Sequence, residues 1–382
     1  MKKITRKIIR RKIYHILCNF FIIKIRKNNK KKVLCSYILK PFILKGAISH
    51  SNLQEARCIA DIICSLGYDV DICDYKNIRK LNYSKYDIIF GFGHHLENAI
   101  YKNFPGKIIH YATGMPQAFQ NGESIKRIRE FKARNNNILA LESARFSYDK
   151  HLLQEQLSHG IISIGGHDTY KEFKKINNNL RIIDTTYIDC GYLEEILSTR
   201  NINSAKNNFL WLGGTGAIHK GLDLLVEAFK DLKNAQLHIV GDIENEPTFF
   251  TYLTNTIKNT NNIFYYGYQN LNSPKMISIF KECTFSILPS CSEGQATSII
   301  NSIGNGGLIP IVTRHGGNDK EYTIHIKELS IESVKNSIIN ALNMTQEEIR
   351  EHQEFAIKTV KYENTLNRFE EKFRTTFLEL IS

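Results

Sequence analysis

Residues 209–242, FLWLGGTGAIHKGLDLLVEAFKDLKNAQLHIVGD, decide the fold class of this chain. The segment begins with an apolar run, 209–214, and continues through the glycine-rich stretch GGTGAIHKG at 213–221. Residues 221–232 then repeat apolar side chains at helical spacing, on a face formed by Leu222, Leu225, Val226 and Phe229. A second apolar run follows at 235–242. A strand, a glycine loop, a helix and a further strand predict a βαβ unit of a parallel sheet.

The same alternation of strand-like and helix-like patterns extends over most of the 382 residues, a length that suits two domains of about 150 residues each. Strand-like runs lie at 33–39, 69–75, 86–93, 107–114, 160–166, 178–189, 261–268, 283–290 and 308–313. The polar stretch 198–208 is the best linker candidate. We therefore predict an α/β chain of two Rossmann-like, doubly wound parallel-sheet domains that face each other across a cleft. The predicted bounds are 33–200 and 201–345, with further helices at 346–382.

The net charge of +13 is concentrated in the first 32 residues, which contain thirteen basic residues and no acid. The rest of the chain is neutral, which argues against a nucleic-acid-binding protein. Eight cysteines show no C-x-x-C or other paired spacing, so we expect neither disulfides nor zinc.

Apolar residues recur at helical spacing within the basic segment 1–32, at Ile9, Ile13, Ile16, Leu17 and Phe20. The apolar run between Lys12 and Lys24 is too short for a bilayer span, which needs roughly 20 residues. We expect an amphipathic helix on the anionic inner face of the cytoplasmic membrane, with the protein cytoplasmic and peripheral. A solvated basic tail, or one bound to RNA, is the alternative.

The loop 213–221 follows a strand and precedes a helix, a position where backbone N–H groups can bind phosphate. Gly213, Gly214 and Gly216, with Thr215, allow close approach, and Lys220 adds a cation. Such loops also occur without any ligand, and the P-loop pattern is not met.

A second strand–turn–helix junction lies at CSEGQATSIIN, residues 291–301, where Glu293 is the only acid. A carboxylate here could accept hydrogen bonds from sugar hydroxyls, while the N–H groups of Gly294 and Gln295 face an anion. Alternatively, Glu293 could simply cap the helix that follows.

Together, HKGLDLLVEAF (219–229) and PSCSEGQATSIINSIGNGGLIPIV (289–312) resemble the donor half of GT-B glycosyltransferases of the family 4, or group 1, type. The resemblance covers roughly residues 205–345. It implies that Lys220 contacts the donor diphosphate and that Glu293, the first glutamate of an E-x7-E pair, contacts the donor sugar. His110, which lies in KIIHYATG at the end of a strand of the first half, matches a family histidine that faces the sugar and phosphate.

The chain departs from the family pattern at two places. Asn301 replaces the second glutamate of the pair, which holds the nucleotide ribose, and an amide can still donate and accept hydrogen bonds there. The family arginine before the lysine is absent, with Gly214 and Thr215 in its place. Arg314 is then a candidate for the missing charge.

The resemblance implies a retaining glycosyltransferase that needs neither a cofactor nor a metal. The predicted partners are a nucleotide-diphosphate sugar, a cell-envelope glycan or lipid-linked acceptor, and an anionic membrane surface. Asp69 and Asp71 spell a D-x-D, but they alternate with apolar residues as in a buried strand, so we assign no metal to them. A GT-B nucleotide-sugar epimerase and a non-catalytic partner subunit are the alternatives.

Overall fold

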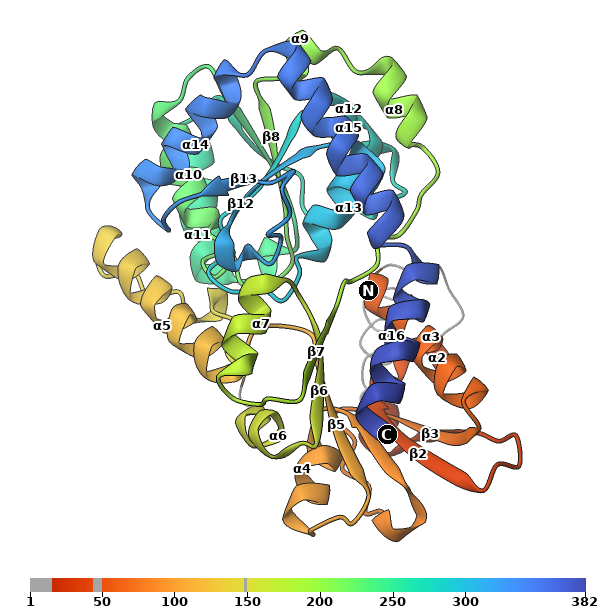
Figure 1. Ribbon diagram of the computed structural model, residues 1–382. Helices are drawn as coiled ribbons and strands as arrows, with labels where there is room; N and C mark the ends of the chain where they lie inside the picture. Colours follow the sequence, from red (N-terminus) through yellow and green to blue (C-terminus); the bar gives the residue numbers. More distant parts are fainter. Residues whose placement is uncertain (1–15, 44–49, 148–149) are drawn as a thin grey trace, which may run out of the picture.

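The computed structural model describes residues 16–43, 50–147 and 150–382, which form two α/β domains (Figure 1). The first domain contains a seven-stranded sheet in the order β1-β3-β2-β4-β5-β6-β7. All neighbouring strands are parallel except β1 and β3, which are antiparallel. The strands are β1 Ile22–Ile25, β2 Lys31–Tyr37, β3 Tyr68–Asp74, β4 Ile88–Gly91, β5 Lys107–Ala112, β6 Gly160–Ile164 and β7 Leu180–Ile183.

Helices connect these strands as the alternating pattern predicts. They are α2 Lys40–Ile43, α3 Ser51–Ser65, α4 His94–Tyr101, α5 Gln117–Arg134, α6 His151–Leu157 and α7 His167–Lys174. The helices α5 and α6 are separated by a loop that contains the short 3-10 turn η2 at Leu141–Ser143.

The second domain contains a parallel six-stranded sheet in the order β10-β9-β8-β11-β12-β13. Its strands are β8 Asn208–Leu212, β9 Gln236–Val240, β10 Ile263–Tyr265, β11 Phe285–Leu288, β12 Ile309–Thr313 and β13 Ile324–Ile326. Its helices are α8 Leu193–Thr199, α9 Ile202–Ala205, α10 Leu222–Asp231, α11 Pro247–Ile257, α12 Pro274–Glu282, α13 Thr297–Gly306, α14 Ile331–Asn343 and α15 Gln346–Glu363. Both sheets confirm the predicted fold class.

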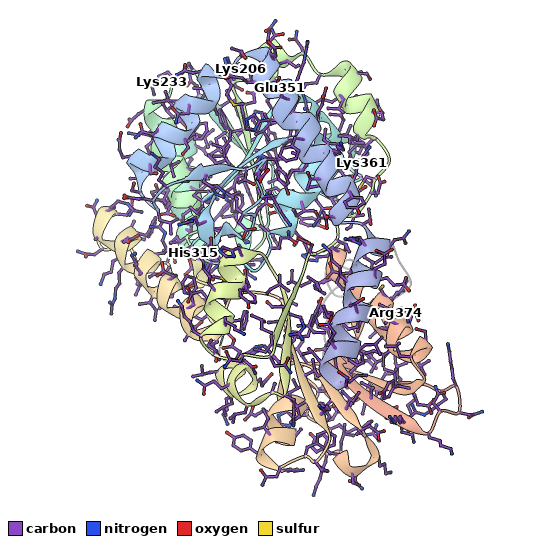
Figure 2. All side chains as sticks on the ribbon, viewed as in Figure 1. Lys206, Lys233, His315, Glu351, Lys361 and Arg374 are labelled. Atoms are coloured by element: carbon purple, nitrogen blue, oxygen red, sulfur yellow. The ribbon has the colours of Figure 1, made fainter. Side chains whose placement is uncertain are left out.

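The last helix, α16 at Leu366–Ile381, leaves the second domain and packs on the first. Figure 1 shows this blue helix beside the orange α3. Its buried side chains Phe369, Phe373, Phe377 and Leu380 belong to the core of the first domain. Arg374, labelled in Figure 2, projects from α16. It donates to Ser65 Oγ at the end of α3 (2.9 Å). The C-terminal helices thus do not form one unit, since α16 completes the first domain.

The first domain also begins earlier than residue 33, because β1 is an edge strand of its sheet. Asp69 accepts hydrogen bonds from the N–H groups of Lys27 (2.9 Å) and Asn29 (3.2 Å), and Asp71 forms an ion pair with Arg26. The D-x-D carboxylates therefore fix the chain around β1. Residues 1–15 of the predicted membrane-binding segment lie outside the described residues.

The chain crosses between the domains at residues 184–192, before the predicted boundary near 200. This extended stretch, the crossing segment, ends at α8, which packs on α12 and α13 of the second domain. The polar residues 198–208 are therefore part of the second domain, where they form the end of α8 and α9. The polar stretch is therefore not the linker. The true linker is the crossing segment, and it could not be recognised by its polarity because side chains from distant helices hold it in place.

Candidate active site

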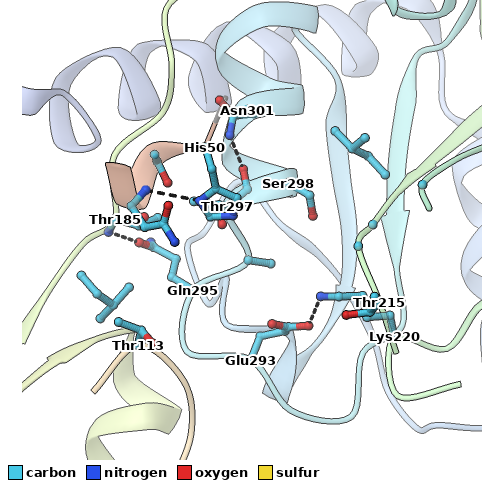
Figure 3. A pocket seen from close by; sticks show the side chains of 18 of the residues that line it. His50, Thr113, Thr185, Thr215, Lys220, Glu293, Gln295, Thr297, Ser298 and Asn301 are labelled. Atoms are coloured by element: carbon cyan, nitrogen blue, oxygen red, sulfur yellow. Dashed lines mark hydrogen bonds and ion pairs between the residues drawn. The ribbon is translucent and has the colours of Figure 1, made fainter. Parts of the chain in front are cut away.

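A cavity of about 560 Å³ lies between the two domains, at the carboxyl ends of strands from both sheets. Ile38 and Thr113 follow β2 and β5 of the first sheet, and Gly213 and Gly241 follow β8 and β9 of the second. This volume falls within the range of about 300–1,000 Å³ typical of small-molecule sites. We call it the donor pocket, after the donor site that the sequence resemblance implies; Figure 3 shows part of its lining.

Glu293 lies in the donor pocket between two cations. Its Oε1 accepts hydrogen bonds from Lys220 Nζ and from Ser290 Oγ (3.1 Å), and its Oε2 accepts one from Arg145 Nη1 (3.0 Å). Burial opposes ionisation of Glu293, but the charges of Lys220 and Arg145 outweigh it and hold the pKa of the carboxyl well below its ordinary value. Glu293 is therefore an anion at neutral pH and acts as a hydrogen-bond acceptor.

Lys220 reaches Glu293 because the two strand–loop–helix units meet at His219. The His219 ring bonds the carbonyl of Ser292 (2.7 Å), and its own carbonyl accepts from the N–H of Cys291 (2.9 Å). Gly221 follows with a φ of +69°, and a Cβ there would meet the carbonyl oxygen of Pro289 at 2.1 Å. Only glycine fits, so the sequence HKG is needed for the two motifs to touch.

Only part of the glycine loop, residues 213–221, lines the donor pocket. Gly213, Gly214 and Thr215 line it, whereas Gly216 does not. The N–H groups of Gly216 (2.5 Å) and Ala217 (2.9 Å) donate to the buried carboxylate of Glu246. This acid occupies part of the loop that we predicted would face phosphate, which leaves Gly213–Thr215 and Lys220 for a ligand.

Gln295 lines the donor pocket, but its amide binds the crossing segment (Figure 3). Its Oε1 accepts from the N–H of Thr185 (2.6 Å), and its Nε2 donates to Asp184 Oδ1 (3.0 Å). Gly294 lies at a close contact between the domains, where a Cβ would meet the carbonyl oxygen of Ile164 at 2.5 Å. Both residues thus fix the arrangement of the domains around the pocket.

Asn301 lines the same pocket and likewise binds the crossing segment. Its Oδ1 accepts from the N–H of Ile188 (2.9 Å), and its Nδ2 donates to the carbonyl of Thr297 (2.8 Å; Figure 3). Asn305, one helical turn later, bonds Cys190 and Ile188 in the same way. An ionised glutamate at position 301 could not donate a hydrogen bond to the carbonyl of Thr297. An amide side chain therefore fits the hydrogen-bond partners present at this position.

His110 lies in a second cavity, of about 170 Å³, inside the first domain. Arg145, Thr113 and Phe92 line both cavities, so the two adjoin. Burial, reinforced by His151, lowers the pKa of His110 to about 3, and its Nδ1 has no hydrogen-bond partner among the described residues. The structure thus places a neutral His110 beside the donor pocket, apart from Glu293.

Arg145 is the site residue that sequence reasoning missed, because it belongs to an irregular loop outside both motifs. Arg314, suggested in its place, has a side chain 73% exposed and lies 3.9 Å from Asp168, away from the pocket lining. Across residues 16–43, 50–147 and 150–382, no group of three or more His, Cys, Asp or Glu side chains is arranged to bind a metal ion. In the same ranges, no helix has the length and apolar composition needed to cross a membrane.

Residues 195–358 match the family of glycosyl transferases group 1. Comparison with curated protein sequences gives no match. Among solved structures, a glycosyltransferase from Rickettsia africae ESF-5 is 15% identical, with a TM-score of 0.59 over 92% of this chain and 99% of that one. Sucrose-phosphate synthase from Thermosynechococcus elongatus is 11% identical, with a TM-score of 0.61 over 92% and 99%.

Anabaena Alr3699/HepE in complex with UDP and glucose is also 11% identical, with a TM-score of 0.59 over 91% of this chain and 99% of that one. At these identities the likeness concerns the fold alone. The family match covers the domain that contains Lys220 and Glu293. Residues 195–358 therefore match a group 1 glycosyltransferase domain, and the chain as a whole has the two-domain GT-B fold.

Proposed function

We propose that this glycosyltransferase moves a sugar from a nucleotide-diphosphate donor to a cell-envelope glycan or lipid-linked acceptor, with retention of configuration and without a metal. The observation that best supports the donor class is Glu293 held between Lys220 and Arg145 in a pocket between the two sheets. The complexes of Anabaena HepE with UDP and with UDP-glucose support a nucleotide-sugar donor in the same fold.

The proposed chemistry follows from the charges that line the donor pocket. The ammonium of Lys220 would stabilise negative charge on the departing diphosphate, a role that in other enzymes is often met by a bound metal. α13 starts without a side-chain cap, so its first N–H groups, at Thr297 and Ser298 on the pocket wall, suit the same anion. Glu293 would accept hydrogen bonds from the sugar hydroxyls and orient the ring.

We expect nucleoside diphosphates and one class of nucleotide sugar to raise the melting temperature, while the nucleosides alone do not. A ligand at 100 times its Kd adds about 2.7 kcal/mol of stability through mass action. A thermal-shift panel of uridine, guanosine, adenosine and thymidine diphosphates and their sugars measures this directly. If no compound shifts the melting temperature, the donor assignment fails and a non-catalytic relative is the better description.

We also propose that the protein binds an anionic membrane surface, which is supported by apolar side chains exposed next to basic ones. Ile16, Phe20 and Phe21 are 61%, 52% and 45% exposed, and Ile78, on a separate loop, is 53% exposed. The two segments touch, because the N–H of Ile78 donates to the carbonyl of Asn19 (2.9 Å). Exposed basic residues flank them at Lys24, Lys27, Lys76, Arg79 and Lys80.

Replacing Phe20 and Ile78 together by Asp is expected to lower binding to anionic vesicles at least about tenfold, since both apolar contact and charge attraction decrease. Co-sedimentation with phosphatidylglycerol vesicles measures the effect. The matched control is Ile339→Asp, an exposed position of the second domain. Deleting residues 1–32 would be a poor test because it removes β1. Equal sedimentation of the double variant and the control would remove this surface from the proposal.

A further inference from the structure

Arg145 belongs to the first domain but reaches into the phosphate side of the donor pocket. Its guanidinium bonds Glu293 (3.0 Å), and it lines the pocket with Thr215 and Lys220. Its side-chain carbons lie against the glycine loop, since a Cβ on Gly216 would come within 2.4 Å of Arg145 Cγ. The cation therefore lies at the loop where a donor diphosphate is expected.

The loop that holds Arg145 is fixed to both domains. On its own side, Gln120 Nε2 donates to the carbonyl of Arg145 (2.8 Å). On the other side, the N–H of His219 donates to the carbonyl of Ser143 (3.1 Å), and the N–H of Thr248 donates to Glu142 Oε1 (2.7 Å). The position of the guanidinium thus depends on how the two domains are placed.

The local charge balance favours an anionic ligand. Lys220 and Arg145 share the single carboxylate of Glu293, so the three groups together have one excess positive charge. The other acids of the lining have other surroundings: Glu55 is bonded to Thr185 and Thr186 of the crossing segment, and Asp242 is exposed after β9. The Arg145 side chain is 40% exposed, so donors of its guanidinium other than the one bonded to Glu293 can reach a ligand.

We propose that Arg145 is a ligand of the donor diphosphate supplied by the first domain, in place of an arginine in the glycine loop. The proposal rests on the nucleotide-diphosphate donor proposed above. Binding of the diphosphate would then depend on the relative placement of the two domains, because the loop of Arg145 forms hydrogen bonds with both of them. The competing explanation is that Arg145 only joins the domains through its ion pair with Glu293.

Gly214 offers a way to separate these explanations, because a Cβ built there has no atom within 4 Å. An arginine introduced at 214 has space, lies on the pocket wall and belongs to the other domain. It can restore a cation to the diphosphate site without restoring the contact between domains that Arg145 provides. The double variant Arg145→Gln with Gly214→Arg therefore shows whether ligand binding needs a cation at the diphosphate or needs the ion pair that joins the two domains.

The experiment measures binding of UDP and inorganic pyrophosphate by titration calorimetry. Losing a charge-assisted hydrogen bond costs about 1.5–3 kcal/mol, so Arg145→Gln is expected to weaken both ligands by roughly 10- to 100-fold. Gly214→Arg in that background is expected to recover most of the loss. The matched control is Arg129→Gln, an exposed arginine of α5 in the same domain, which should bind like the wild type.

Unchanged affinity in Arg145→Gln with a lowered melting temperature would overturn the proposal in favour of the joining role. A loss of affinity that Gly214→Arg does not recover would also count against it. If the wild-type protein binds neither UDP nor pyrophosphate while the thermal-shift panel shows another nucleoside diphosphate, the titration is made with that compound. If no diphosphate binds the wild type at all, the proposed function itself fails together with this inference.

Discussion

Glu293→Gln is expected to reduce sugar transfer by at least about 100-fold, the loss that follows when a reacting group is no longer correctly held. The carboxylate accepts from Lys220 and Ser290 at Oε1 and from Arg145 at Oε2, and a glutamine would place an NH2 donor at one of these two positions, facing a cation. The donor sugar would then lose its acceptor, and Lys220 would lose the partner that fixes its ammonium at the diphosphate. Initial rates of transfer at saturating donor measure the effect.

The folded state of the Glu293→Gln variant has to be checked in the same experiment. Removing one member of a buried ion pair leaves an uncompensated charge at Lys220, so we also expect a lower melting temperature. Circular dichroism at the assay temperature shows whether the variant is folded there. Glu354→Gln, an exposed acid in the middle of α15, is the control and should be fully active. A folded Glu293→Gln enzyme with wild-type rates would remove Glu293 from the active site.

Arg127→Met is the substitution expected to cost the most stability, about 3–5 kcal/mol in the free energy of unfolding. Arg127 lies on α5 and donates through Nη2 to both carboxylate oxygens of Asp223 on α10 (2.8 and 2.7 Å), with the two side chains 0% and 1% exposed. Arg134 also pairs with Asp223. α5 belongs to the first domain by sequence, yet Ile128 and Phe131 pack in the core of the second.

Urea unfolding followed by fluorescence measures this cost in the relevant core, because Trp211 is the only tryptophan of the chain and lies in the same apolar cluster. Arg129→Gln on the exposed side of α5 is the control and should change the unfolding midpoint little. The double variant Arg127→Met with Asp223→Leu should recover much of the loss, since it removes both buried charges. A change below about 1 kcal/mol for Arg127→Met would mean that the pair is exposed to water in solution.

The fold and part of the site could be predicted from the sequence because both depend on local patterns. Apolar runs that end in glycines gave the parallel strands, and HKG and SEG lie where such strands end. Lys220 and Glu293 consequently meet in the structure. The basic residues of α5 could not be placed in the same way, because such a run of charges is typical of a solvated face, whereas Arg127 is buried between the domains.

The remaining features depend on contacts between distant segments, which no local pattern encodes. Arg145 lies in a loop without periodicity, and only the packing of η2 against the second domain brings it to Glu293. Asn301 occupies the position of the family's ribose-binding glutamate, and its amide oxygen accepts from the N–H of Ile188 in the crossing segment. The helix α16 has an ordinary amphipathic pattern that does not tell which domain it covers. Each of these is fixed by tertiary structure.

The most direct measurement is the release of nucleoside diphosphate from a panel of nucleotide sugars, with membrane glycolipid extract as acceptor and no added metal. We predict that the wild-type enzyme turns over one class of donor with acceptor-dependent release of the diphosphate, that chelator has no effect, and that the product keeps the anomeric configuration of the donor. We predict that Glu293→Gln releases none. Release in the absence of any acceptor with formation of an isomeric nucleotide sugar, or binding of donors without turnover, would contradict a sugar transferase.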